Sequence, residues 1–433
     1  MLPLFNLSLS QSKFPSQWKK ANVSPIYKKN DRQNDTNYRP ISLLSCIGKI
    51  LERIVFIKLY EYCMRNNLLT WRNSGYKHLD STINQLIYLS HQIYSALSQG
   101  YDVCFVSLDA SSAFDRVWHE GLIHKLERIG ITGRLLSWFK SYLSDRIQRV
   151  VIGGSSSEWI YIKAGVPQGS ILGPLLFLIY IDDIIDNIDS EILLFADDTS
   201  LLKVITDSQQ CFTDINRDLE TLRQWSENWL VQFNPTKTKY MIFSKKTIRP
   251  VYPTLHIGNT QVEEVSKHKQ LGITFSNTMT WEHHVSDICK RAGSRVDAIR
   301  RLPSSITPFS RLHIYTTFVR PLLEYGSVLF DNCIITLSDQ LENIQRQAAL
   351  AITRAYQHTS HTNLLLELGL QTLHQRRTNS KLILLFKIKN NLTPEYMKGL
   401  LPAEIGDNTN IQTRTARSIR HPPKPGKKQP TQN

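Results

Sequence analysis

Cysteine is scarce in this sequence of 433 residues, and the six cysteines are scattered. No two of them are separated by only two residues, which is the spacing of zinc-binding pairs, and no closely spaced framework for disulfides is present. This pattern argues against a disulfide-stabilised secreted domain and a zinc knuckle, and it favours a reducing compartment. We therefore expect an intracellular protein.

Long apolar runs are also lacking. The longest covers residues 171–181 and contains Gly173 and Pro174. It is too short for the roughly 20 residues that cross a bilayer. The first ten residues are apolar but have neither a positively charged start nor a small-residue cleavage site, so no targeting signal is recognised. We expect no membrane partner.

Acidic residues are outnumbered by basic ones, 37 against 52, which gives a formal net charge of +15 at pH 7. Hydrophobic residues make up 41%, so most of the chain should fold. An excess of positive charge on a folded protein favours a polyanionic partner. Nucleic acid is the first candidate and an anionic membrane surface the second. The alternative is a solvated basic surface without such a partner. Residues 401–433 lack acidic residues after Asp407 and are expected to form a basic disordered tail.

Apolar spacing predicts alternating helices and strands along the chain. A glycine pair at residues 153–154 lies between two β-rich stretches and predicts a hairpin. The order of the elements indicates a mixed sheet with helices on one face, and hence an α+β fold. The expected strands are 101–108, 148–152, 159–162, 192–195, 199–204 and 240–243, and the expected helices include 81–98, 114–130 and 212–231.

Three aspartates stand at the ends of predicted strands. Asp109 ends one strand, while Asp197 and Asp198 lie in the tight connection between two others. Alone, the pair reads as an ordinary polar turn. Neighbouring strands could bring all three together, and their repulsion would then require divalent cations. Oxygen ligands with room for phosphates suit Mg²⁺, and two such ions stabilise the attacking and leaving oxygens of a phosphoryl transfer. The aspartates therefore indicate nucleotidyl transfer.

Residues 165–170 (GVPQGS) form a glycine-flanked turn before an apolar helix. Gly165 and Gly169 would let the backbone approach a base pair or sugar closely, although the stretch alone also reads as a left-handed turn and a helix start. Two other motifs accompany this turn in chain order: D-x4-F, which starts at Asp109, and F-A-D-D at residues 195–198. The three motifs together are a much more specific indication of nucleotidyl transfer than any one of them alone.

These motifs resemble the reverse transcriptases of non-LTR retrotransposons, the LINE-type elements, and most of all the jockey group. The likeness runs from about residue 14 to about residue 370. It rests on a first fingers motif at 38–43 (YRPISL), motif A at 107–117, motif B at 164–177, motif C at 195–198, motif D at 234–238, a primer grip at 271–272, and thumb and connecting stretches at 320–326 and 341–346.

The resemblance implies a right-hand polymerase of the α+β class. Its palm would hold a small mixed or antiparallel sheet, and its thumb would be helical. The reverse transcriptase core would cover about residues 20–275. The implied parts are fingers at 1–100, a palm at 101–245 with a fingers insertion at about 120–163, the primer grip, thumb and connection at 246–400, and the tail at 401–433.

The resemblance also implies a metal site. Asp109 and Asp197 would hold two Mg²⁺ ions, with Mn²⁺ as an alternative. Asp198 would complete the acidic cluster, and Ala110 would contribute its backbone carbonyl. Lys237 would lie near the pyrophosphate and protonate it as it leaves, with Lys239 as the rival general acid.

Nucleotide and template contacts are implied for five further residues. Phe114 would be the steric gate against a ribose 2′-hydroxyl, or else a core aromatic. Gln168 and Gly169 would line the nascent base pair. Arg39 and Lys77 would contact the triphosphate or the template backbone. The stretch around Lys77 departs from the family's usual Gly-Phe-Arg, and a lysine lacks the bidentate fork of arginine.

The implied function is RNA-directed DNA synthesis from dNTPs on an RNA template with a DNA primer. The family's N-terminal endonuclease is expected to be absent from this chain, and the nucleus or cytoplasm is the expected location. A catalytically inactive, element-derived relic that binds nucleic acid is the alternative. A group II intron-type maturase would share the palm, but no maturase segment is recognised. The sequence indicates no particular oligomeric state.

Overall fold

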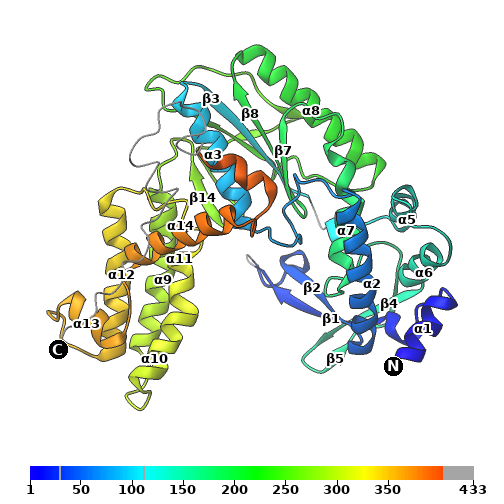
Figure 1. The fold of residues 1–433 in the computed structure, drawn as a ribbon, viewed down its shortest axis with the longest axis horizontal. Coiled ribbons are helices and arrows are strands. Elements are labelled where there is room, and N and C mark those ends of the chain that lie inside the picture. The colour runs from blue at the N-terminus through cyan, green and yellow to red at the C-terminus, as the bar shows by residue number, and fades with distance from the viewer. Residues whose placement is uncertain (29–30, 111–112, 403–433) are drawn as a thin grey trace, which may run out of the picture.

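The computed structural model describes residues 1–28, 31–110 and 113–402. They form two five-stranded β-sheets with the helices that pack on them, two small two-stranded sheets and a C-terminal group of helices (Figure 1). The tail predicted for residues 401–433 lies outside the described residues from residue 403 onward. Among the helices of the described ranges, none combines the length and the apolar character needed to cross a bilayer.

The N-terminal sheet joins the start of the chain to a segment more than 100 residues later. Strand β1 (Lys20–Tyr27) pairs antiparallel with β2 (Tyr38–Leu43) and parallel with β4 (Arg146–Ile152). Strand β4 also pairs antiparallel with β5 (Ser155–Ser156) and β6 (Ile160–Ile162), which confirms the predicted hairpin around the glycine pair. The nearby helices share one apolar core and are α1 (Leu2–Ser10), α2 (Cys46–Arg65), α4 (Ala113–Arg116), α5 (His119–Arg128), α6 (Gly133–Leu143) and α7 (Leu172–Ile181).

The central sheet has the strand order β12-β9-β3-β8-β7. Neighbouring strands are antiparallel, except for the parallel pair β12 and β9. The bounds are β3 (Asp102–Leu108), β7 (Glu191–Phe195), β8 (Asp198–Ile205), β9 (Lys239–Phe243) and β12 (Glu263–Glu264). Strands β3, β7, β8 and β9 confirm predicted strands, whereas β12 was not predicted. The predicted strands 148–152 and 159–162 belong to the N-terminal sheet, so the strands form two large sheets where the sequence indicated one.

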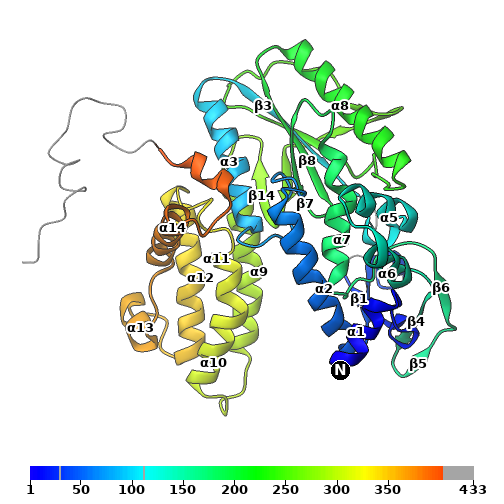
Figure 2. The same cartoon turned by 45° about the vertical axis from the view of Figure 1, so that its right-hand side comes forward.

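Helices cover both faces of the central sheet, so the expectation of helices on one face is wrong. Helix α3 (Thr82–Ser98) packs on the face that carries Val103 and Phe105. Helix α8 (Ser208–Asn228) packs on the opposite face (Figures 1 and 2). The physical reason lies in β3, whose apolar run is nearly unbroken and is therefore buried on both sides. The α+β class itself is confirmed.

The C-terminal part combines a small hairpin with helices, and it shares a core with α3 and the central sheet. The hairpin is formed by β13 (Lys267–Gln270) and β14 (Ile273–Ser276). The helices are α9 (Glu282–Arg300), α10 (Pro308–Ile314), the π-helix η4 (Tyr315–Val319), α11 (Arg320–Glu324), α12 (Ile335–Thr353), α13 (His361–Leu368), α14 (Leu373–Lys389) and the 3-10 helix η5 (Glu395–Leu400). The remaining short elements are η1 (Ser16–Lys19), η2 (Asp35–Asn37), η3 (Asp182–Ile185), β10 (His256–Ile257) and β11 (Thr260–Gln261).

Two expected helices have different bounds in the structure. The helix predicted at 114–130 is divided into α4 and α5, because Val117 and Trp118 leave the helical path between them. The helix predicted at 212–231 begins earlier, where the side chain of Asp207 caps it by accepting a hydrogen bond from the amide of Gln210.

Candidate active site

Strand register brings the three predicted aspartates near one another. Strands β7 and β8 form a tight hairpin in which Phe195 pairs with Asp198, so Ala196 and Asp197 make the turn. Strand β3 pairs with β8 up to Leu108 opposite Thr199. Continued by one residue, this register places Asp109 opposite Asp198. The end of β3 and the β7–β8 turn therefore meet.

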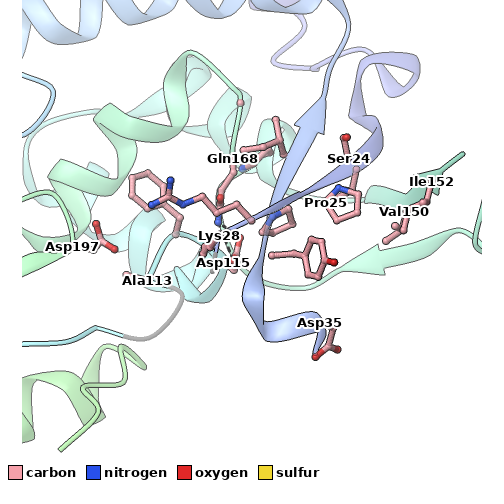
Figure 3. A pocket seen from close by; sticks show the side chains of 18 of the residues that line it. Ser24, Pro25, Lys28, Asp35, Ala113, Asp115, Val150, Ile152, Gln168 and Asp197 are labelled. Carbon is pink, nitrogen blue, oxygen red and sulfur yellow. Dashed lines mark hydrogen bonds between the residues drawn. The ribbon is translucent and has the colours of Figure 1, made fainter. Parts of the chain in front are cut away.

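A cavity of about 1590 Å³ opens beside this turn, and side chains from both sheets line it. Asp109 and Asp197 contribute carboxylates from the central sheet, whereas Asp198 does not line the cavity. Basic side chains come from the N-terminal sheet and its β1–β2 connection: Lys28, Arg32 and Arg39. Figure 3 shows Asp197 at one end of the cavity, with Asp35 and Ile152 toward the other. The cavity thus brings carboxylates of the central sheet together with cations of the N-terminal sheet.

The surroundings of the turn disfavour the charged form of its two carboxylates, Asp197 and Asp198. Desolvation, followed by the nearby charges of Asp197 and Asp109, raises the pKa of Asp198 to about 6, although its side chain remains partly open to solvent. Burial also raises the pKa of Asp197, and repulsion from Asp109 adds to it, while Arg39 and Lys28 act in the opposite direction. Bound cations would relieve this repulsion.

Lys237 lies beside Asp109, and Lys239 does not. The loop between α8 and β9 is tied to the end of β3, because the amide of Asn234 donates to the carbonyl of Asp109 at 2.8 Å. Lys237 Nζ is 3.7 Å from Asp109 Oδ2 and lines the cavity. Lys239 instead forms an ion pair with Glu263 at 2.6 Å. Of the two rivals, only Lys237 is placed at the cavity.

The glycines of residues 165–170 contact the protein's own backbone. Both have positive φ, and a Cβ on Gly165 would lie 2.7 Å from the carbonyl oxygen of Asp115. A Cβ on Gly169 would lie 2.7 Å from the carbonyl oxygen of Ser42. In this structure the two glycines allow close internal packing contacts, and their approach to a base pair or sugar stays a prediction.

Gln168 is fixed in the cavity by a residue to which the sequence interpretation gave no role. Its Nε2 donates to both carboxylate oxygens of Asp115 at 3.0 Å, and its backbone carbonyl accepts a hydrogen bond from the backbone amide of Ser42 at 2.8 Å. Gly169 lines the same cavity. The loop is thus tied both to α4 and to β2.

Phe114 lines the cavity and also packs against neighbouring aromatic rings. Its ring stacks on Phe177 with centroids 4.3 Å apart and meets Tyr76 edge-on at 6.1 Å. Ala110, next to Asp109, lines the cavity as well. Both expectations for Phe114, a gate and a packed aromatic, are compatible with this half-buried position.

Lys77 is not among the residues that line the cavity. Its Nζ donates to the carbonyl oxygens of Leu69 and Thr70. Burial lowers the pKa of Lys77, and the nearby charges of Asp182 and Asp80 partly oppose that effect. The structure therefore separates Lys77 from the other predicted site residues.

The structure identifies Asn73 as a residue that the sequence interpretation missed. Its side chain is 2% exposed, and its Oδ1 accepts hydrogen bonds from the amides of Gly75 at 3.0 Å and Ala196 at 3.2 Å. Ala196 has a φ of 55°, which is unusual for a residue with a Cβ. Asn73 therefore holds the turn that presents Asp197. A contact across 123 residues leaves no signal in the sequence pattern.

The donor set of this site suits a hard cation. Within the described ranges, no three His, Cys, Asp or Glu side chains gather closely enough to hold a metal ion by themselves. Two cavity carboxylates and the backbone at Ala110 offer oxygen ligands, and Mg²⁺ commonly takes one or two carboxylates together with substrate phosphates and water. The residues therefore fit an ion whose coordination a substrate completes.

The comparisons with a family model and with individual proteins agree on one family. Residues 26–275 match the family described as "Reverse transcriptase (RNA-dependent DNA polymerase)". The Drosophila melanogaster protein "Probable RNA-directed DNA polymerase from transposon BS" is 30% identical over 385 residues, which cover 86% of this chain and 42% of that protein. The Drosophila melanogaster "RNA-directed DNA polymerase from mobile element jockey" is 30% identical over 338 residues, covering 75% of this chain and 36% of that protein.

Among solved structures, an apo telomerase from Candida Tropicalis overlaps 79% of this chain and 59% of its own, with a TM-score of 0.47 and 12% identity. The chain spans less than half the length of the two Drosophila relatives.

Proposed function

Because this chain belongs to the reverse transcriptase family, we propose that it is the polymerase part of a non-LTR retrotransposon and extends a DNA primer on an RNA template. One observation carries the proposal. Asp109 and Asp197 line the same cavity as the basic side chains of the N-terminal sheet. A triphosphate in that cavity would lie between metal-binding carboxylates and cations.

The chain's own residues would hold the reactants of nucleotidyl transfer. Asp109, Asp197, Asp198 and the Ala110 carbonyl would hold two Mg²⁺ ions, or Mn²⁺ in their place. These ions would supply charge stabilisation at the attacking and leaving oxygens. The 3′-oxygen of the primer would bond to the α-phosphorus as its proton passes to solvent water, and the bond to the pyrophosphate oxygen would break. Lys237 would donate the proton that this oxygen takes up.

The other cavity residues would select the nucleotide. Arg39 would face the triphosphate or the template backbone. Phe114 would lie against the sugar and exclude a 2′-hydroxyl, and Gln168 with Gly169 would line the nascent base pair. Lys77 would act only indirectly, through the segment that it binds.

The division into fingers (1–100), palm (101–245) and thumb with connection (246–400) stays a proposal. The parallel pairing of β1 with β4 supports a fingers insertion at about 120–163. Helix α3 falls within the residues assigned to the fingers, but it shares the core of the central sheet, so this helix would pack with the palm. We propose that the protein acts in the nucleus or cytoplasm. The six free cysteines agree with this proposal, because free thiols are typical of reducing compartments.

Primer extension tests the proposal. Purified protein is given poly(rA)/oligo(dT), dTTP and Mg²⁺, beside an Asp197→Asn variant. We expect extension by the wild type, none by the variant, and similar salt-sensitive binding of template–primer by both. Binding without extension by the wild type would refute the polymerase and indicate a nucleic-acid-binding relic.

A further inference from the structure

The helix η5 returns from the C-terminal helices to α3. Figure 1 shows this red-orange segment beside α3, and Figure 2 shows the same arrangement from another side. Met397 is fully buried. The ring of Tyr396 packs against Trp71, with centroids 5.7 Å apart, and against Tyr88 at 5.4 Å. The segment is therefore anchored on the residues that precede and begin α3.

The hydroxyl of Tyr396 contacts two points of that region. It donates to Asp80 Oδ1 at 2.8 Å and lies 3.3 Å from Ser74 Oγ. Asp80 Oδ1 also accepts from the amide of Ser81, the residue that caps α3. One phenol thus links the start of α3 to Ser74, which is 3% exposed.

Ser74 lies between the two residues that contact the catalytic turn. On one side, Asn73 accepts the amide of Ala196. On the other, Gly75 lies so close that a Cβ there would be 2.5 Å from the backbone nitrogen of Ala196. The amide of Ser74 itself donates to the carbonyl of Leu194 at 2.9 Å. Any shift of Ser74 would therefore move the β7–β8 turn.

We propose that Tyr396 is a positioning residue for the polymerase reaction. By fixing Ser74 and Asp80, it holds the 73–75 segment against Ala196 and so sets the place of the Asp197 carboxylate. Tyr396 does not line the cavity and acts only through this chain of contacts. The inference rests on the proposed function, which gives Asp197 its role. It makes the C-terminal part of the chain a determinant of active-site geometry.

Two variants of the full chain test this role. Tyr396→Phe removes only the hydroxyl, and Tyr396→Ala also removes the ring. Tyr356→Phe is the matched control, because Tyr356 is 89% exposed. Amide hydrogen exchange of residues 192–200 is measured without nucleic acid, and kcat and KM for dTTP are measured by primer extension.

We expect exchange in the turn to quicken about threefold to tenfold in Tyr396→Phe, the range for one lost hydrogen bond, and further in Tyr396→Ala. The kcat should fall by a similar factor with KM unchanged, and the control should match the wild type. Unchanged exchange of residues 192–200 in Tyr396→Ala would overturn the inference. Hydrogen exchange tests the positioning role of Tyr396 even if the wild type extends no primer. A failure of the proposed polymerase function can therefore be distinguished from a failure of this inference.

Discussion

The acidic turn should lower the stability of the folded protein at neutral pH. Desolvation and the carboxylates of Asp197 and Asp109 raise the pKa of Asp198 from 3.8 to about 6. A carboxyl whose pKa rises on folding holds its proton more tightly in the folded state, so the protonated form supports folding at low pH. That contribution is lost as the pH rises from about 4 to about 6. Asp198→Asn should therefore stabilise the protein at pH 7.5 and not at pH 4.

The size of the effect follows from linkage. A pKa difference of about two corresponds to about 3 kcal/mol. Because the side chain of Asp198 is partly open to solvent, we reduce the expected gain to about 1 kcal/mol. For a chain of this size, that gain raises the midpoint of thermal unfolding by roughly 1–2 °C.

Thermal unfolding in EDTA, followed at pH 4, 6 and 7.5, measures this gain. The control is Asp339→Asn, which changes an exposed aspartate on α12 and should shift no midpoint. Adding Mg²⁺ at pH 7.5 should stabilise the wild type more than Asp198→Asn, because the variant lacks one of the proposed metal ligands. An Asp198→Asn protein that is less stable than the wild type at pH 7.5, or equally stabilised at pH 4, would refute the electrostatic reasoning.

Three further predictions concern the same site. Gly75→Ala should reduce primer extension by about fivefold or more, from the roughly 1–3 kcal/mol of a backbone overlap with Ala196, while circular dichroism stays unchanged; full activity would contradict the close approach. Lys237→Ala should lower kcat by about 10²-fold or more, and Lys239→Ala should not; equal losses in single-turnover assays would exclude Lys237 as the proton donor. Phe114→Val should admit ribonucleotides in competition assays, and unchanged sugar selectivity would assign Phe114 to packing alone.

Local patterns predicted the central sheet and the acidic turn. The apolar run that ends at Asp109 is bounded by polar residues, so it could be recognised as a strand without any knowledge of its partners. The two short apolar stretches around residues 196–197 permit only a tight hairpin. Family motifs then indicated which of these residues share a cavity.

Contacts that depend on the three-dimensional path of the chain were not predictable. The motif around Lys77 predicts a nucleotide-binding cation, yet the ammonium group of Lys77 donates hydrogen bonds to the backbone carbonyls of Leu69 and Thr70. Nothing in the local sequence of Asn73 indicates its contact with Ala196. The second covered face of the central sheet was missed because α8 follows β8 in the chain, and the order of elements does not say which face each helix covers.

The parallel pairing of β1 with β4 has a consequence for biosynthesis. Lys20 to Val23 pair with Ile147 to Val150, so one edge of β1 stays open until more than 120 further residues have left the ribosome. Such a distant pairing slows folding, and an open strand edge invites association with other chains. A nascent chain of this protein should therefore depend on chaperones until β4 emerges, and a fragment that stops before residue 146 should aggregate.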